Sequence, residues 1–175
     1  EIGVKAVVLI GGGEPMAHPE FGTLVDYFYE NDIHVGVTSN GTLIDKFANS
    51  LANHTKWVRI SVDAGSEEVF QQYRPHASGK SQFNKVIDGM KKLSKSRKTK
   101  LGFSFLVLEK VGADKKYNEK GQNFVETNAT DIFKAAKLAK EIGCDYFEVK
   151  PSFDPFHFLN DTSALMSNII KDELN

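Results

Sequence analysis

The chain has 175 residues, of which 41% are hydrophobic and 26% charged, a balance typical of a globular domain with a sizeable core. Its 22 basic and 23 acidic residues nearly cancel, which argues against a strongly basic nucleic-acid binder. No apolar run approaches the roughly 20 residues that a membrane span needs. A single cysteine, Cys144, excludes a disulfide framework and any multi-cysteine metal site built by this chain alone, and it fits a cytoplasmic protein.

Five short apolar runs, each followed by glycine or polar residues, predict β-strands. The runs are nearly continuous instead of alternating, which is typical of strands covered on both faces in a parallel sheet. We place these strands at about residues 4–10, 33–38, 57–63, 100–108 and 146–150.

The segments between these runs predict α-helices. Apolar side chains recur there with helical spacing, most clearly over residues 21–28 and 83–93. Thr130 or Asp131 is placed to cap a further helix over residues 132–142. Alternating strands and helices require right-handed crossovers and a parallel sheet. The sequence therefore predicts an α/β fold of parallel βα repeats.

Two features concern the extent of the chain. It opens at Glu1 without an initiator methionine or signal peptide and enters a strand pattern within five residues, so we expect a fragment of a longer protein. We treat residues 1–175 as a single domain. A polar insertion at 109–127 is long for a βα loop and is typical of a lid, a partner-contact loop or a disordered segment.

A run of three glycines, Gly11 to Gly13, follows the first predicted strand. In parallel α/β folds, ligands bind at the carboxyl ends of the strands. Gly12 and Gly13 would let a ligand approach the backbone closely, and Glu14 offers a carboxylate that suits an ammonium group or a cation. The run lacks the Lys and Ser/Thr of a phosphate-binding loop and the spacing of a dinucleotide motif. Taken alone, it also fits an ordinary tight turn.

Polar residues also follow the later strands. Ser61 and Asp63 are two residues apart on one strand, so their side chains share a face, and an Asp in that position often accepts from ribose hydroxyls. Arg74 supplies a positive charge for a ligand carboxylate. The same rim of the sheet carries Asn40, Ser104, Glu148 and Lys150. Each of these residues also fits a turn or a helix cap, and their shared placement is what favours a ligand site.

These motifs resemble those of radical S-adenosylmethionine (radical SAM) enzymes, most closely the peptide-modifying and cofactor-maturing subgroup. The resemblance spans nearly all of residues 1–155 and depends on the order and spacing of several short motifs. They are Gly12-Gly13-Glu14-Pro15, Thr38-Ser39-Asn40-Gly41-Thr42, Ile60-Ser61-Val62-Asp63-Ala64, Tyr73-Arg74, and Glu141 to Pro151.

The resemblance implies a role for each matching residue. Gly12, Gly13 and Glu14 would hold the amino group of the methionine moiety of SAM. Ser61 and Asp63 would contact its ribose or carboxylate. Arg74 would pair with the methionine carboxylate, and the same pocket would be lined by Asn40 and Ser104. The implied fold is an open, partial (β/α)6 TIM-like barrel whose first strand is missing here.

One departure from the family pattern concerns the metal cofactor. Radical SAM enzymes ligate a [4Fe–4S] cluster through a Cys-x3-Cys-x2-Cys loop after their first strand, and this chain contains no such loop. The resemblance therefore places the cluster ligands upstream of residue 1. The complete enzyme would reductively cleave SAM to a 5′-deoxyadenosyl radical that abstracts hydrogen from its substrate, whereas we predict the chain alone to be inactive.

Several alternatives and partners stay open at this point. A non-catalytic α/β module that binds a nucleotide-like ligand or a protein partner is the main alternative. A further one is acid–base or metal chemistry by Glu14, Asp63 and Lys150. The family resemblance implies a flavodoxin- or ferredoxin-like reductant, and a substrate that is a peptide or a small molecule. An exposed strand edge at the missing first strand would favour self-association.

Overall fold

A five-stranded parallel sheet organises the part of the chain that the computed structural model describes, residues 3–95, 97–108, 116–117, 123–124 and 127–151. Its strand order is β1-β2-β3-β4-β7, so chain neighbours are also sheet neighbours apart from the last crossover. The strands are β1 (Ala6–Leu9), β2 (His34–Ser39), β3 (Trp57–Ser61), β4 (Lys100–Val107) and β7 (Tyr146–Pro151). The predicted α/β fold with five parallel strands is confirmed.

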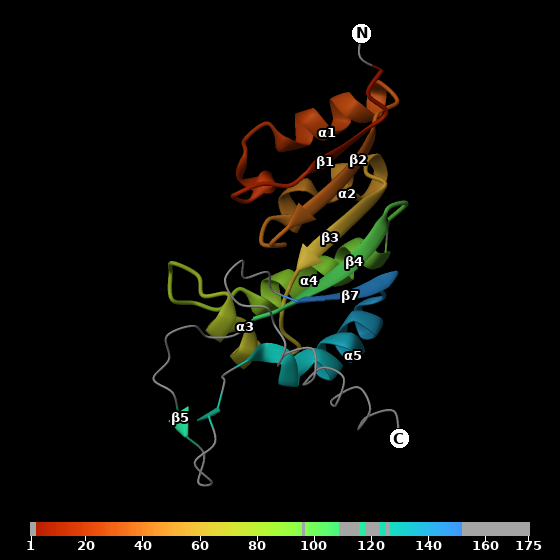
Figure 1. The fold of residues 1–175 in the computed structure, drawn as a ribbon. Helices are drawn as coiled ribbons and strands as arrows, with labels where there is room; N and C mark the ends of the chain where they lie inside the picture. The colour runs from red at the N-terminus through yellow and green to blue at the C-terminus, as the bar shows by residue number, and fades with distance from the viewer. Residues whose placement is uncertain (1–2, 96, 109–115, 118–122, 125–126, 152–175) are drawn as a thin grey trace.

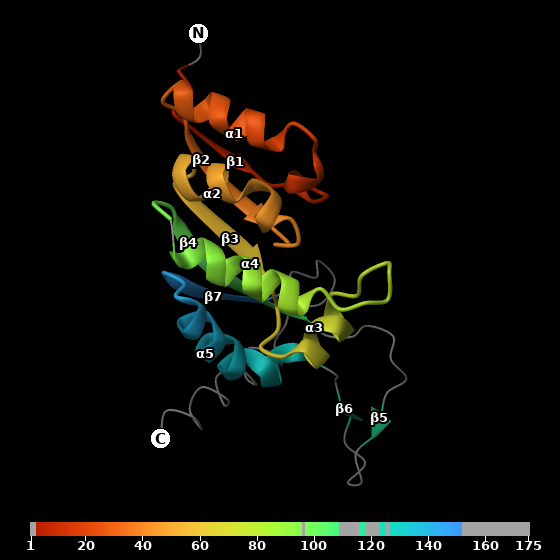
Figure 2. The same ribbon diagram turned by 180° about the vertical axis from the view of Figure 1, so that it is seen from behind.

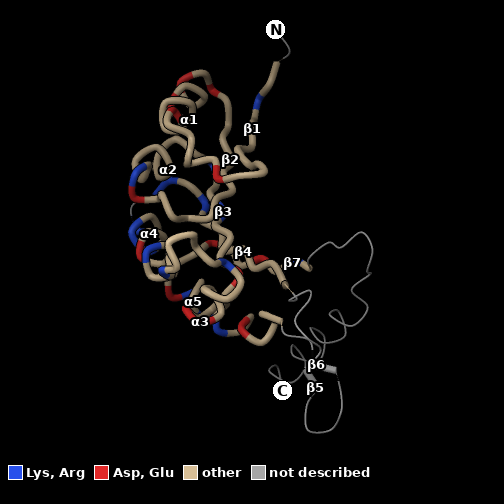
Figure 3. Tube along the Cα trace, turned by 90° about the vertical axis from the view of Figure 1, so that its left-hand side faces the viewer, with Lys and Arg blue, Asp and Glu red and all other residues tan. Residues whose placement is uncertain are grey.

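The described helices cover one side of this sheet (Figures 1 and 2). Seen edge-on, they form a separate layer beside the strands (Figure 3). The α-helices are α1 (Phe21–Glu30), α2 (Ala48–His54), α3 (Glu67–Tyr73), α4 (Phe83–Lys95) and α5 (Ile132–Ile142). Short 3-10 turns are η1 (Pro15–Ala17), η2 (Ile44–Phe47) and η3 (Asn128–Asp131), and a two-stranded antiparallel pair is formed by β5 (Lys116–Tyr117) and β6 (Asn123–Phe124).

The hydrophobic core lies between the helices and the sheet. Val58 and Ile60 of β3 are fully buried, and Phe103 and Phe105 of β4 continue the same apolar layer. The alternate residues of β3 are half-buried and occupy the opposite face of the strand, as the period of two requires. We call this opposite side of the sheet, turned away from the helices, the inner face.

The first strand forms one edge of the described sheet. In β1, Val8 is 53% exposed, and Ile10 just beyond it is 58% exposed. An open strand edge with exposed apolar side chains favours pairing with another strand. Self-association through this edge is a prediction that nothing in the structure tests.

Most of the predicted polar insertion 109–127 lies outside the described residues. No helix of the described part has both the length and the apolar character to cross a membrane.

A close approach of two backbones fixes the loop after β3 against helix α5. A Cβ added at Gly65 would lie 2.3 Å from the backbone nitrogen of Ala135 and 2.6 Å from the carbonyl carbon of Lys134. The carboxylate of Asp131 also accepts a hydrogen bond from the Gly65 N–H at 2.6 Å. The loop and the helix can therefore pack this closely because residue 65 has no side chain.

We expect Gly65→Ala to lower the free energy of unfolding by about 2–3 kcal/mol, because a backbone cannot move aside as a flexible side chain can. Urea denaturation measures this change. Gly11→Ala is the matched control, since a Cβ at Gly11 meets no atom within 4 Å. Equal unfolding midpoints for both variants would contradict the packing described for Gly65.

Candidate functional site

A cavity of about 440 Å³ opens at the carboxyl ends of β1, β2 and β3. Five predicted site residues line it together, namely Gly13, Glu14, Asn40, Ser61 and Arg74. A neighbouring cavity of about 410 Å³ shares Asn40 and Arg74 and is also lined by Asp63. The structure thus gathers residues from four separate segments at one end of the sheet.

The glycine loop contributes exposed backbone to this site. A Cβ at Gly11, Gly12 or Gly13 would meet no atom within 4 Å, and none of the three has a left-handed φ. The conformation and packing of the chain therefore do not require glycine at these positions. Their missing side chains leave room for a group that does not belong to the described chain, which is what close approach of a ligand needs.

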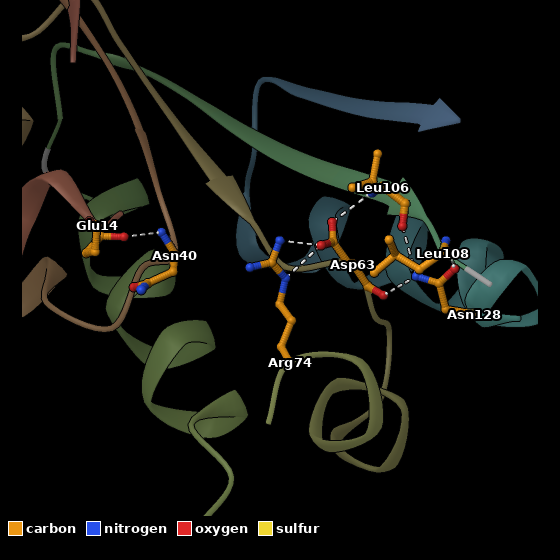
Figure 4. Close-up of polar contacts among 7 residues, drawn as sticks. All are labelled: Glu14, Asn40, Asp63, Arg74, Leu106, Leu108 and Asn128. Atoms are coloured by element: carbon orange, nitrogen blue, oxygen red, sulfur yellow. Dashed lines mark hydrogen bonds and ion pairs between the residues drawn. The ribbon is translucent and has the colours of Figure 1, made fainter. Parts of the chain in front are cut away.

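Glu14 ties the glycine loop to the end of β2. Its Oε1 accepts hydrogen bonds from the Ser39 hydroxyl at 2.8 Å and from the Met16 N–H at 3.0 Å. Its Oε2 accepts from the Asn40 N–H at 2.7 Å (Figure 4). Because charged acceptors make the stronger hydrogen bonds, this carboxylate holds the two loops at a fixed separation.

The turn after β2 is built by its own polar residues. The Asn40 side-chain oxygen accepts from both the N–H and the hydroxyl of Thr42, at 2.9 and 2.8 Å. Between them, Gly41 has a φ of +80°, and a Cβ there would lie 2.8 Å from Ile60 and Val86. The turn therefore requires glycine at position 41, and it presents Asn40 to both cavities.

Asp63 and Arg74 form a buried ion pair between the two cavities. The Asp63 side chain is 1% exposed, and its Oδ2 accepts from the Arg74 guanidinium, from Nε at 2.6 Å (Figure 4). Its Oδ1 accepts from the Leu106 N–H at 2.7 Å, and its φ is +58°, a conformation that Asp and Asn tolerate better than most residues. Both Asp63 oxygens are thus engaged within the chain, while Arg74 lines both cavities.

Asn128 is a site-forming residue that the sequence did not indicate. It is fully buried, and its side-chain nitrogen donates to the carbonyls of Asp63 and Leu106, both at 2.9 Å. Its side-chain oxygen accepts from the Leu108 N–H at 2.8 Å (Figure 4). Asn128 therefore clamps the Asp63 loop onto the end of β4. Its position just after the predicted insertion offered no pattern that could have found it.

Of the remaining predicted residues, Ser61 lines one cavity, whereas Ser104 and Gly12 line neither. Ser61 and Ser104 face each other in register on β3 and β4. Ser61 is half-buried and lines the 440 Å³ cavity, whereas Ser104 is 6% exposed and lines neither cavity. The Ser104 carbonyl accepts from the Val62 N–H at 3.1 Å. Gly12 belongs to the glycine loop but is not among the residues that line the cavity.

Cys144 lies at the turn between α5 and β7, away from the glycine loop. Burial raises the pKa of its thiol to about 12. At pH 8 the thiolate, which is the reactive form, is therefore scarce. We expect iodoacetamide to alkylate Cys144 at least about a hundredfold more slowly in the folded protein than in urea, as measured by mass spectrometry. Equal rates would show that the thiol is ionised and accessible.

Within the described ranges, no three His, Cys, Asp or Glu side chains are grouped as a metal site would require. The whole sequence also has one cysteine. The residues present therefore do not fit an iron–sulfur cluster, which is usually held by several cysteine thiolates.

Comparison with known proteins places the chain among enzymes of one superfamily. Residues 1–110 match the family model described as the radical SAM superfamily. Over 96 residues the chain is 32% identical to the GTP 3′,8-cyclase of Aliarcobacter butzleri (strain RM4018). The matched region covers 53% of this chain and 28% of that relative. The chain thus spans about a quarter of the length of this relative.

Solved structures share the fold at lower identity. The structure of TYW1 with a lysine-pyruvate adduct bound matches with a TM-score of 0.62 and 22% identity, over 90% of this chain and 45% of that chain. Streptococcus suis SuiB bound to S-adenosylmethionine matches with a TM-score of 0.59 and 13% identity, over 97% of this chain and 36% of that chain. At these identities the likeness concerns the fold alone.

Proposed function

Because the chain belongs to the radical SAM superfamily, whose members use SAM and a [4Fe–4S] cluster, we propose that its 440 Å³ cavity holds SAM. The observation that carries this proposal is the glycine loop, which is open although nothing in the described chain requires glycine there. Gly12 and Gly13 would offer their backbone to the amino group of the methionine moiety. Glu14 would hold that loop in place through its bonds to Ser39 and Asn40.

Arg74 would pair with the methionine carboxylate, since it lines the cavity and carries the charge that a carboxylate requires. Asp63 would fix the position of this guanidinium through their ion pair, in addition to any contact with SAM. Ser61 would reach the ribose from the end of β3, and Asn40 and Ser104 would complete the surroundings. Asn40, Ser61 and Arg74 line this cavity, whereas Ser104 lies beside it, opposite Ser61 on the neighbouring strand.

We further propose that the whole protein is a radical SAM enzyme. A [4Fe–4S] cluster, when bound, would supply the electron for reductive cleavage of SAM and so the radical chemistry of the family. Its cysteine ligands would come from a segment that this chain does not contain, so the chain alone would bind SAM without cleaving it. A flavodoxin- or ferredoxin-like reductant in the cytoplasm would provide the electron, and the substrate would be a small molecule or a peptide.

Anaerobic purification of the whole protein tests this function. We expect about four irons per protein after reconstitution, an EPR signal of the reduced form that changes on adding SAM, and release of 5′-deoxyadenosine. The 175-residue chain prepared in the same way should bind no cluster and release no 5′-deoxyadenosine. A whole protein that lacks iron would instead indicate a non-catalytic module that binds a nucleotide-like ligand or a protein.

A further inference from the structure

A ladder of polar side chains crosses the inner face of the sheet below the proposed SAM cavity. The Arg59 guanidinium of β3 donates to the Thr38 hydroxyl of β2 and to Glu148 Oε2 of β7, both at 3.1 Å. Lys150 Nζ lies 3.1 Å from the same Glu148 oxygen. The ladder therefore passes over β4 and joins three strands that are not all neighbours.

Two aromatic rings lie against glycines of neighbouring strands on the same face of the sheet as this ladder. A Cβ at Gly36 of β2 would lie 2.2 Å from the Trp57 ring, and a Cβ at Gly102 of β4 would lie 2.1 Å from the Tyr146 ring. Each ring thus lies across the neighbouring strand, and the Arg59 guanidinium lies 5.8 Å from the Trp57 ring centroid. The Trp57 ring therefore lies beside the guanidinium of the ladder.

The ladder carries excess positive charge at a position that solvent reaches. Arg59 and Lys150 are two cations on the single carboxylate of Glu148, so the three side chains have a net charge of +1. Their side chains are 21%, 40% and 33% exposed, in that order. The described helices lie on the other side of the sheet (Figure 3).

The bonding of Arg59 is also incomplete. Its two terminal nitrogens donate to two different partners, and its buried Nε has no hydrogen-bond partner among the described residues. A guanidinium pairs best with a carboxylate through two parallel bonds, and neither of its present partners makes that pair. The existing contacts position the guanidinium without using its full bonding capacity.

We infer that Arg59 and Lys150 bind a carboxylate group of the substrate, which competes with Glu148 for these two cations. This inference rests on the proposed function, because the ladder lies on the strand that carries Ser61. Two residues along a strand span about 7 Å, so a substrate held at Arg59 would lie next to SAM held at Ser61. One carboxylate neutralises the net charge of +1, whereas a phosphate dianion would reverse it.

Tryptophan fluorescence of the whole protein tests this inference, because Trp57 is the one tryptophan of these 175 residues and adjoins Arg59. A Trp57→Phe variant supplies the background of any tryptophan elsewhere. The probe is N-acetylglycine, a monocarboxylate, and N-acetylglycinamide is its uncharged counterpart. We expect a saturable change with N-acetylglycine and none with the amide.

Three variants separate binding from a purely structural ion pair. Arg59→Gln should weaken N-acetylglycine binding by roughly tenfold or more, the scale of a lost charge-assisted hydrogen bond. Glu148→Gln should strengthen it severalfold, because it removes the competing carboxylate and raises the net charge. Lys92→Gln, on the surface of α4, is the control and should have no effect.

No saturable change in the wild type would overturn the inference, and so would weakening by Glu148→Gln as well as by Arg59→Gln. If inorganic phosphate binds more tightly than N-acetylglycine, and Arg59→Gln weakens its binding as well, the ligand group is a phosphate and not a carboxylate. SAM binding is measured on the same samples. Its absence in the wild type would refute the proposed function, whereas normal SAM binding without N-acetylglycine binding refutes this inference alone.

Discussion

Replacing Asp63 with alanine is expected to lower the free energy of unfolding by about 3 kcal/mol, the scale of a broken buried ion pair with an orphaned backbone donor. The Leu106 N–H loses its acceptor, and Arg74 loses the carboxylate that it pairs with. Arg74 is 29% exposed, so water recovers part of this loss. Alanine also tolerates the φ of +58° at this position poorly.

Urea denaturation of three variants tests this account of Asp63. Asp63→Asn should fall between wild type and Asp63→Ala, because its side-chain oxygen can still accept from Leu106 and Asn tolerates positive φ. Asp45→Ala is the matched control. It removes a surface pair with Lys92 in which the side chains are 51% and 68% exposed, so it should change stability by less than about 0.5 kcal/mol. A loss below about 1 kcal/mol for Asp63→Ala would contradict the buried pair.

Replacing Gly13 with valine is expected to weaken SAM binding by roughly tenfold to a hundredfold, because the new side chain would occupy space that the ligand needs. The free energy of unfolding should change little, since a Cβ at this position meets no atom within 4 Å. The separation of binding from stability is the signature of a residue that serves the ligand. Isothermal titration calorimetry of the whole protein with its cluster measures the affinity.

Ala17→Val is the matched control for Gly13→Val. It adds branched apolar bulk at an exposed position in η1, four residues further along the chain and outside the cavity lining. Its SAM affinity should equal that of the wild type. Unchanged SAM binding by Gly13→Val, with a folded protein, would remove the glycine loop from the proposed site.

The strands of the sheet could be predicted from the sequence because each contains a short apolar run, whose side chains on one face pack against the helices. Val58 and Ile60 of β3 are buried, as are Phe103 and Phe105 of β4. Because these side chains are apolar, the local sequence is enough to predict that their strands are buried. The capping of helix α5 was harder to predict from the sequence. Asp131 was predicted as a candidate cap of α5 and occupies its N-cap position, but its side chain makes no capping hydrogen bond. Its carboxylate instead accepts from Gly65 and Ser66 and pairs with Lys134.

The candidate site could be predicted as a set of residues but not as a set of contacts. The carboxyl ends of parallel strands meet at one edge, so the sequence could place Glu14, Asn40 and Ser61 there together. It could not show that Asp63 is buried against Arg74, nor that Asn128 clamps it from 65 residues away. Those contacts depend on where η3 packs, which no local pattern encodes.

Hydrogen–deuterium exchange of the whole protein with and without SAM tests the central claim most directly, because it locates the ligand on the chain. We predict that SAM slows exchange of the backbone amides in residues 11–13 and 39–41, the two loops that contribute to the lining of the 440 Å³ cavity. The exposed residues 77–80, beyond those that line the neighbouring cavity, should show little change. SAM that binds without protecting residues 11–13 would contradict the assignment of this cavity as its site.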